Sequence, residues 1–226
     1  MKLKSNCYLM PLSPVFNQEY VPVFENFDKE HSSILWSTLY RNGYEVLSSY
    51  PDCPYSLIFD EADRLFLPDN FKERNDIIFG NTVDKETLMK NLSEKYFRKY
   101  ENNIIMLAAS IGYTHQDISK ALNLLNTTDD SLVLGRSFNN KISFAGFNTF
   151  PDFLNTTSIE YDYILAESCR HNSILYTLDN FMSIQNAADF KKLYQELSKK
   201  ESLAYCSQEI HEKFTHLFIE YKELLK

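Results

Sequence analysis

The sequence predicts an α/β fold, with a three-layer α/β/α architecture and a mostly parallel central sheet. Strand-like and helix-like segments alternate from residue 76 to about residue 200, as in parallel sheets whose strands are joined by helices. Residues 104–109 form a continuous apolar run, which is typical of a central strand covered on both faces. No repeat, low-complexity linker or break in composition divides the chain, so residues 1–226 are predicted to form one domain.

The individual elements follow from local patterns. Strands are expected at residues 76–80, 104–109, 132–134, 142–147 and 174–178. Residues suited to capping a helix N-terminus precede the helical patterns, at Asp84, Thr114, Ser158, Asn186 and Ser207. Asn102 and Asn103 are expected to end the helix that Asp84 begins, and residues 139–141 are expected to form a turn between two strands. In the first third, strands are expected at residues 7–10 and 55–59, with a helix near residues 31–41 between them.

Composition narrows the functional classes. A net charge of −8 gives no electrostatic support for nucleic-acid binding, so no nucleic-acid partner is expected. The four cysteines are widely spaced and form no CxxC pair, which favours free thiols over a zinc or redox site. No segment approaches the ~20 apolar residues of a membrane span, and prolines interrupt the N-terminal apolar stretch. We therefore expect a cytoplasmic protein without a membrane partner; no pattern specifies its oligomeric state.

Two segments carry a family resemblance. At Asn103–Ser110 (NIIMLAAS) and Ser131–Arg136 (SLVLGR) the chain resembles a bacterial family of uncharacterised glycosyltransferase-like proteins. The resemblance covers roughly residues 75–195 in the order of elements. It implies the nucleotide-diphospho-sugar transferase fold (GT-A, SpsA-like) and a nucleotide-sugar ligand. The reaction it implies is glycosyl transfer from a nucleoside-diphosphate sugar.

The chain departs from this family at its acidic residues. Ser110 stands at the position of an aspartate after the central strand, and residues 139–141 (Asn-Asn-Lys) replace Asp-Gly-Gly. In the third segment Ser183 and Gln185 replace two further aspartates. Carboxylates at such places hold the divalent cation that bridges nucleotide phosphates. The resemblance thus implies that the Mg²⁺ or Mn²⁺ site is lost, so we predict no metal and no other cofactor, and we assign no catalytic residue.

The neutral replacements still suit a ligand. Asn139 and Gln185 carry amides that can hydrogen-bond a sugar or a base, and Ser110 follows a buried strand. Each also has a structural interpretation, since Ser110 can simply pack in a turn and Asn139 can be a turn residue. We take Ser110, Asn139 and Gln185 as the candidate nucleotide-sugar crevice.

Acidic residues also follow the strand at residues 55–59. Asp60, Glu61 and Asp63 can line a ligand crevice, because ligands of α/β sheets bind at the carboxyl ends of strands. A solvated loop beside Arg64 is the interpretation that we prefer.

Three functions therefore stay open. One is metal-independent or inactive glycosyltransferase-like chemistry, and the second is a non-catalytic ligand- or partner-binding protein on the same scaffold. The third is an unrelated α/β enzyme that uses Asp60 or Glu61 as an acid–base group. The chain has five glycines and neither a GxGxxG nor a Walker motif, so a glycine-rich phosphate loop is not expected.

Overall fold

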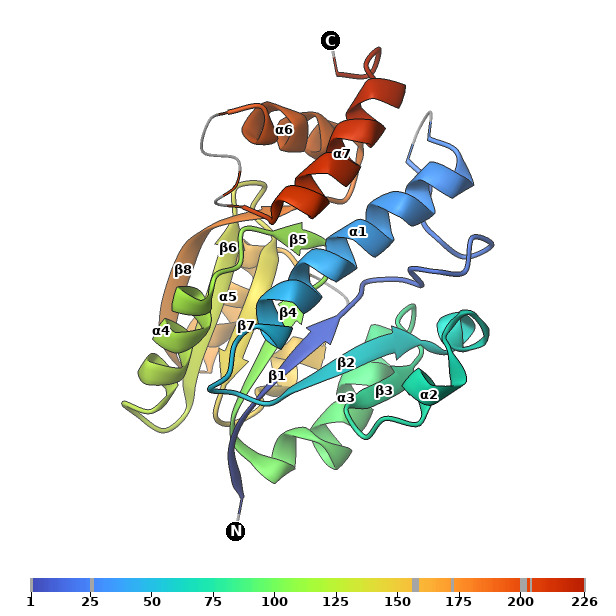
Figure 1. Cartoon of the computed structure of the whole chain (residues 1–226). Helices are drawn as coiled ribbons and strands as arrows, with labels where there is room; N and C mark the ends of the chain where they lie inside the picture. Colours follow the sequence, from blue (N-terminus) through green and yellow to red (C-terminus); the bar gives the residue numbers. More distant parts are fainter. Residues whose placement is uncertain are drawn as a thin grey trace.

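One sheet organises the molecule. The computed structural model describes residues 2–24, 27–155, 159–171, 173–199, 203 and 205–225, and within them eight strands pair in the order β3-β2-β1-β4-β7-β6-β8-β5 (Figure 1). The strands are β1 (Leu3–Met10), β2 (Tyr55–Asp60), β3 (Ile77–Gly80), β4 (Tyr100–Leu107), β5 (Ser110–Ile111), β6 (Ser131–Ser137), β7 (Ile142–Phe147) and β8 (Ile174–Ser183). The pairings give six of these strands one direction, and only β7 and β5 run against them. This agrees with the predicted α/β class and its mostly parallel sheet.

Helices cover both faces of the sheet. They are α1 (Lys29–Ser48), α2 (Asp69–Lys72), α3 (Lys85–Lys95), α4 (His115–Leu125), α5 (Tyr161–Arg170), α6 (Ala187–Leu197) and α7 (Gln208–Glu220), with short 3-10 turns η1 (Glu61–Phe66), η2 (Phe97–Lys99) and η3 (Asp152–Asn155). Buried residues of α1, α4, α6 and α7 share one core, and those of α3 and α5 share the other. In Figure 1, α1 crosses in front of the sheet and α5 lies behind it.

The two cores follow from the period of the strands. Successive side chains of a strand point to opposite faces, so an apolar strand feeds both layers. In β1, Cys7 and Leu9 join the α1 side, whereas Tyr8 and Met10 join the α3 side. The second half of strand β4 alternates in the same way from Ile104 to Leu107, which explains why this stretch is apolar throughout.

Local capping chemistry set most helix starts. The side chains of Asp84, Thr114, Asn186 and Ser207 each accept a hydrogen bond from the backbone N–H of the first turn that follows. Thr114 and Asp117 form the expected capping box. Ser158 lies outside the described residues; α5 begins at Tyr161, directly after Glu160.

The predicted end of the helix that Asp84 begins was wrong. Helix α3 ends at Lys95, and Asn102 and Asn103 lie inside β4 rather than at a helix end. Strand pairing overrode their turn preference, because β1 pairs with β4 from Tyr100 onward. The Asn103 amide donates to the carbonyl oxygen of Phe97 at 3.2 Å, so its polar group is satisfied in the core.

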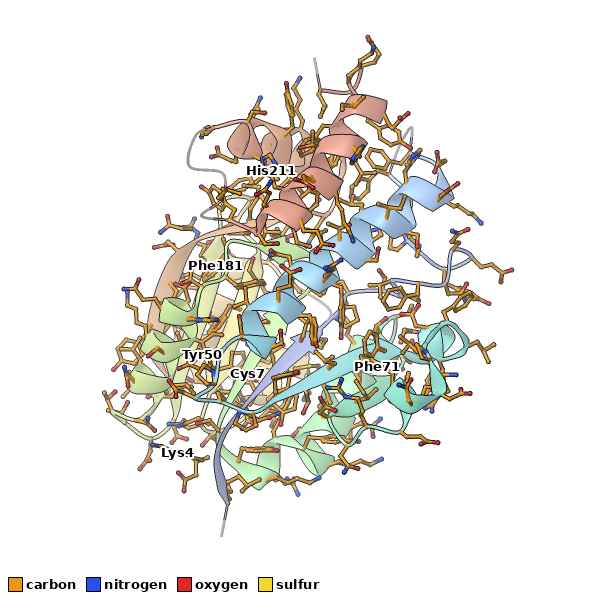
Figure 2. All side chains as sticks on the ribbon, viewed as in Figure 1. Lys4, Cys7, Tyr50, Phe71, Phe181 and His211 are labelled. Atoms are coloured by element: carbon orange, nitrogen blue, oxygen red, sulfur yellow. The ribbon has the colours of Figure 1, made fainter. Side chains whose placement is uncertain are left out.

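The thiols are free, as expected, but two of them are neighbours. The Sγ atoms of Cys7 and Cys53 lie 3.6 Å apart in the core, and Figure 2 labels Cys7 on β1. Cys206 is buried and Cys169 is exposed. Among the described residues, no helix combines the length and the apolar character that a membrane crossing requires.

Candidate functional site

The candidate residues all follow strand ends at one edge of the sheet. Because six strands run in one direction, the segments after β2, β4, β6 and β8 emerge at the same carboxyl-terminal edge. Asp60 ends β2, Ser110 follows β4, Asn139 follows β6 and Gln185 follows β8. The chain order reverses between β1 and β4, and such switch points are where α/β sheets usually bind ligands.

Three of these segments meet at Ser183. Ser110 pairs with Ser183 across the antiparallel strands β5 and β8. The Asn139 side-chain amide donates to the carbonyl oxygen of Ser183 at 2.9 Å. The Gln185 amide lies 3.5 Å from the Ser183 hydroxyl. Ser110, Asn139, Ser183 and Gln185 form what we call the Ser183 cluster, which brings together the residues that the resemblance placed in one crevice.

The polar groups of this cluster are largely bonded to one another. Asn139 Oδ1 accepts from the Ser137 hydroxyl, and the backbone N–H of Gln185 donates to Asp189 at 3.0 Å. Ser110 is fully buried, and its hydroxyl has no hydrogen-bond partner among the described residues. Asn139 and Gln185 are partly exposed. Any ligand at the cluster would therefore meet amide groups rather than the serine hydroxyl.

The hairpin between β6 and β7 shapes the rest of the site. Asn140 adopts a left-handed conformation (φ 60°), which asparagine tolerates better than most residues and which closes the turn. Gly135 precedes the turn. No side chain fits at the Gly135 position, since a Cβ there would lie 2.4 Å from the Cβ of Phe144. Phe181 of β8, labelled in Figure 2, stacks on Phe144 at 6.2 Å between ring centres. These contacts fix the hairpin against β8.

Cationic side chains surround this hairpin. The Arg136 guanidinium lies 5.0 Å from the ring centre of Tyr161, and the Lys192 ammonium of α6 lies 4.6 Å from that of Phe138. Lys141 pairs with the Glu160 carboxylate. In the part of the chain that the structure describes, no group of three or more His, Cys, Asp or Glu side chains is placed to hold a metal ion.

A cavity opens beside the hairpin. It has a volume of about 370 Å³ and lies between the end of β6, strand β8 and α6. Its lining includes Arg136, Phe138, Asn180, Glu196 and Tyr205. Phe138 is 46% exposed, so an aromatic face is presented to solvent next to two cations. We call this space the hairpin cavity.

Within the part of the chain that the structure describes, the acidic residues after β2 form no hydrogen bond with the Ser183 cluster, and Asp60 has a structural role. Asp60 is buried; its carboxylate accepts from the Ala62 N–H at 2.8 Å and from both the N–H and the hydroxyl of Thr82 at 2.7 Å. It therefore ties the end of β2 to the segment after β3. Glu61 is exposed and pairs with Arg64 at 2.8 Å. The prediction of a solvated loop beside Arg64 is therefore confirmed for Glu61 and wrong for Asp60, whose side chain is buried.

Asp63 has a structural role that no sequence pattern signals. Its carboxylate is fully buried and accepts from the three backbone N–H groups of Val15–Asn17, at 2.8–2.9 Å. Burial raises the pKa of Asp63, and the three N–H donors pull that pKa the other way. The loop between β1 and α1 is thus held in place by a side chain that lies 46–48 positions away.

The fold class follows from these layers and this strand order: the molecule has the fold of nucleotide-diphospho-sugar transferase-like and cytidylyltransferase structures. No protein-family model and no curated protein matches the sequence. A crystal structure from Desulfovibrio desulfuricans G20, named as a candidate nucleotide-diphospho-sugar transferase, matches with a TM-score of 0.68 at 15% identity, over 98% of this chain and 99% of that one.

Two further structures match less closely. A cytidylyltransferase from Leptospira borgpetersenii gives a TM-score of 0.51 at 10% identity, covering 100% of this chain and 97% of its own. A CMP:2-keto-3-deoxy-manno-octonic acid synthetase solved with CTP gives 0.51 at 5% identity, covering 86% and 98%. At such identities these likenesses establish the fold alone.

Proposed function

We propose that this chain is a glycosyltransferase-like protein that binds a nucleoside-diphosphate sugar at the carboxyl-terminal edge of its sheet, without a carboxylate-held metal. The ligand would lie along the Ser183 cluster and the hairpin cavity. The observation that carries the proposal is the meeting of the segments after β4, β6 and β8 at Ser183. The CTP bound to one protein of the same fold supports a nucleotide ligand.

Neutral groups and cations would share the work of recognition. The partly exposed amides of Asn139 and Gln185 suit sugar hydroxyls or a base, because amides both donate and accept hydrogen bonds. In glycosyl transfer, the bond from the anomeric carbon to the diphosphate breaks as the acceptor oxygen bonds that carbon, and the acceptor hydroxyl releases its proton to water or to the departing diphosphate. Negative charge then gathers on the leaving diphosphate. Arg136 and Lys192 beside the cavity would stabilise that charge in place of a metal ion.

A second function is favoured by a different observation. The Asn139 amide is already bonded to the Ser183 carbonyl, and the Ser110 hydroxyl is fully buried. A site whose polar groups are committed to one another keeps its shape but offers little for catalysis. The same scaffold would then bind a ligand or a partner without transferring a sugar.

Ligand stabilisation against heat tests the binding proposal. We expect nucleoside diphosphates or nucleotide sugars to raise the melting temperature equally with and without Mn²⁺; a ligand at about a hundred times its Kd stabilises by about 2.7 kcal/mol. Arg136→Gln should weaken that effect, whereas Arg98→Gln, at an exposed position on η2, should leave it unchanged.

The outcomes separate the alternatives. A shift that requires Mn²⁺ would contradict the loss of the metal site, and no shift with any donor would contradict nucleotide-sugar binding. Where a donor binds, release of free nucleoside diphosphate in the presence of sugar acceptors identifies a transferase. If a donor binds but no nucleoside diphosphate is released, under conditions in which a control glycosyltransferase uses the same acceptors, the non-catalytic function is favoured.

A further inference from the structure

A second cavity lies on the opposite face of the sheet, between α3 and α5. Its volume is about 50 Å³, which is room for a body of only a few heavy atoms. Its walls are formed by strand residues such as Met10, Leu107 and Ile142, and by helix residues such as Met89 and Ile164. Among the described residues, every lining side chain is apolar except that of Lys85. We call it the α3–α5 cavity.

Lys85 lines this cavity, and none of the described residues provides a counter-charge for it. It is the first residue of α3 and is partly buried, and no hydrogen bond, ion pair or ring contact joins it to another described residue. The neighbouring Asp84 carboxylate instead accepts from the Thr87 N–H at 3.1 Å to cap the helix. Burial lowers the pKa of Lys85, as expected for an ammonium beside an apolar wall.

A cation in this position is costly unless something binds it. Fully buried lysines are almost always paired, and the partly buried Lys85 loses some of its hydration to an apolar wall that does not replace it. The walls offer apolar contacts worth about 25 cal/mol per Å² to any hydrocarbon that fills the space. A ligand with one anionic group and a small apolar body satisfies both features at once.

We propose that the α3–α5 cavity binds a small apolar carboxylate, with its hydrocarbon against the cavity walls and its carboxylate on the Lys85 ammonium. A carboxylate fits better than a phosphate, because one ammonium matches one negative charge and no second cation lines the cavity among the residues that the structure describes. The proposal is independent of the nucleotide-sugar function. The cavity opens on the α3 side of the sheet, whereas Phe181 and Met182, beside the Ser183 cluster, belong to the α1-side core.

Methionine methyl groups provide a local readout. Met10 and Met89 line the cavity, whereas Met106 and Met182 belong to the core on the other face. In protein labelled with ¹³C at the methionine methyls, acetate, propanoate or butanoate, which match the small volume of the cavity, should shift the Met10 and Met89 signals. The Met106 and Met182 signals should stay in place.

Charge recognition is tested with matched ligands and variants. The alcohol of the same chain length should bind about tenfold more weakly than the carboxylate, because it cannot form the charge-assisted hydrogen bond. Lys85→Met should weaken carboxylate binding by about tenfold and leave alcohol binding unchanged, and Lys85→Arg should keep most of the carboxylate affinity. Lys90→Met, which removes an exposed lysine of the same helix, should have no effect.

Several results would overturn the proposal. If no carboxylate moves the Met10 or Met89 signals, the cavity is not a ligand site. Equal binding of alcohol and carboxylate, or equal affinity of Lys85→Met and the parent protein, would show that Lys85 does not recognise an anion. Shifts at Met106 and Met182 alone would place the bound molecule on the other face.

Discussion

Two regions at the carboxyl-terminal edge of the sheet, the segment after β2 and the Ser183 cluster, differ in whether their polar side chains are charged. After β2, the buried carboxylates of Asp60 and Asp63 collect six hydrogen bonds between them, five of these from backbone N–H groups and one from a hydroxyl. After β4, β6 and β8, the polar groups at Ser183 are neutral and bond to one another. Charged side chains hold the loops together after β2, whereas the four members of the Ser183 cluster, where the resemblance implies a metal site, have uncharged side chains.

The difference shows what a buried carboxylate needs. Asp63 stays in the core because three N–H dipoles replace its hydration, and Asp60 because the Thr82 N–H and hydroxyl do the same. The Ser183 cluster has no comparable set of donors, since its amides are paired with a carbonyl and with hydroxyls. A carboxylate placed there would need an added cation, whereas neutral amides stay folded without one.

Removing Asp63 should have the largest effect. Asp63→Ala leaves three N–H groups of Val15–Asn17 without an acceptor in the core, so we expect a loss of about 3 kcal/mol in the free energy of unfolding. Chemical denaturation followed by circular dichroism measures it. Glu61→Ala on the same turn is the control, and its exposed pair with Arg64 predicts a change below about 0.5 kcal/mol. Equal losses for both variants would show that Asp63 does not anchor the loop.

Adding a charge to the Ser183 cluster should have an intermediate effect. In Asn139→Asp the carboxylate cannot donate to the Ser183 carbonyl and faces that oxygen instead, which predicts a loss of about 1–2 kcal/mol at neutral pH. Repulsion raises the pKa of the new carboxyl in the folded state. The unfolded state therefore releases its proton first, and the loss grows as pH rises above about 4.

A matched asparagine separates this effect from a general cost of Asn→Asp. Asn81 only accepts, from the N–H groups of Val83 and Asp84, so Asn81→Asp should cost little at any pH. Denaturation midpoints of both variants from pH 4 to pH 8 make the comparison. A flat profile for Asn139→Asp would mean that the cluster is better hydrated than its geometry indicates. Recovery of its stability on adding Mn²⁺ would show that one carboxylate is enough to recreate a cation site.

Sequence reasoning reached the features that depend on neighbours in the chain. Helix caps such as Asp84 and Thr114 were predictable because donor and acceptor lie three residues apart. The shared edge of Ser110, Asn139 and Gln185 was also predictable, since each follows a strand of common direction. Asn102 was misread because local turn preference was weighed without the pairing of β4 to β1.

What could not be predicted depends on distant partners. The reach of Asp63 to Val15–Asn17 spans more than forty positions, and no local pattern signals it. The same holds for the Asn139 amide, which donates its hydrogen bond to the Ser183 carbonyl 44 positions away. The isolation of Lys85 is visible only once α3 and α5 have packed together around the cavity.

Removing Lys85 should have the smallest effect on stability. This residue extends the comparison to a charged side chain that has no oppositely charged partner among the described residues. Its pKa is lowered in the folded state, so between that value and the unfolded value of about 10.4 the unfolded chain binds more protons. The stability of the parent protein relative to Lys85→Met should therefore rise as pH increases toward that upper value.

The size and the control of this effect follow from exposure. Lys85 is only partly buried, so solvent screening keeps the difference below about 1 kcal/mol, with Lys85→Met at least as stable as the parent at neutral pH. Lys90→Met, from an exposed position on α3, should give a difference that does not vary with pH. If Lys85→Met instead destabilises the protein at neutral pH, the ammonium has a stabilising contact inside the fold. Lys85 would then be a paired charge like Asp60 and Asp63, and not an unpaired one.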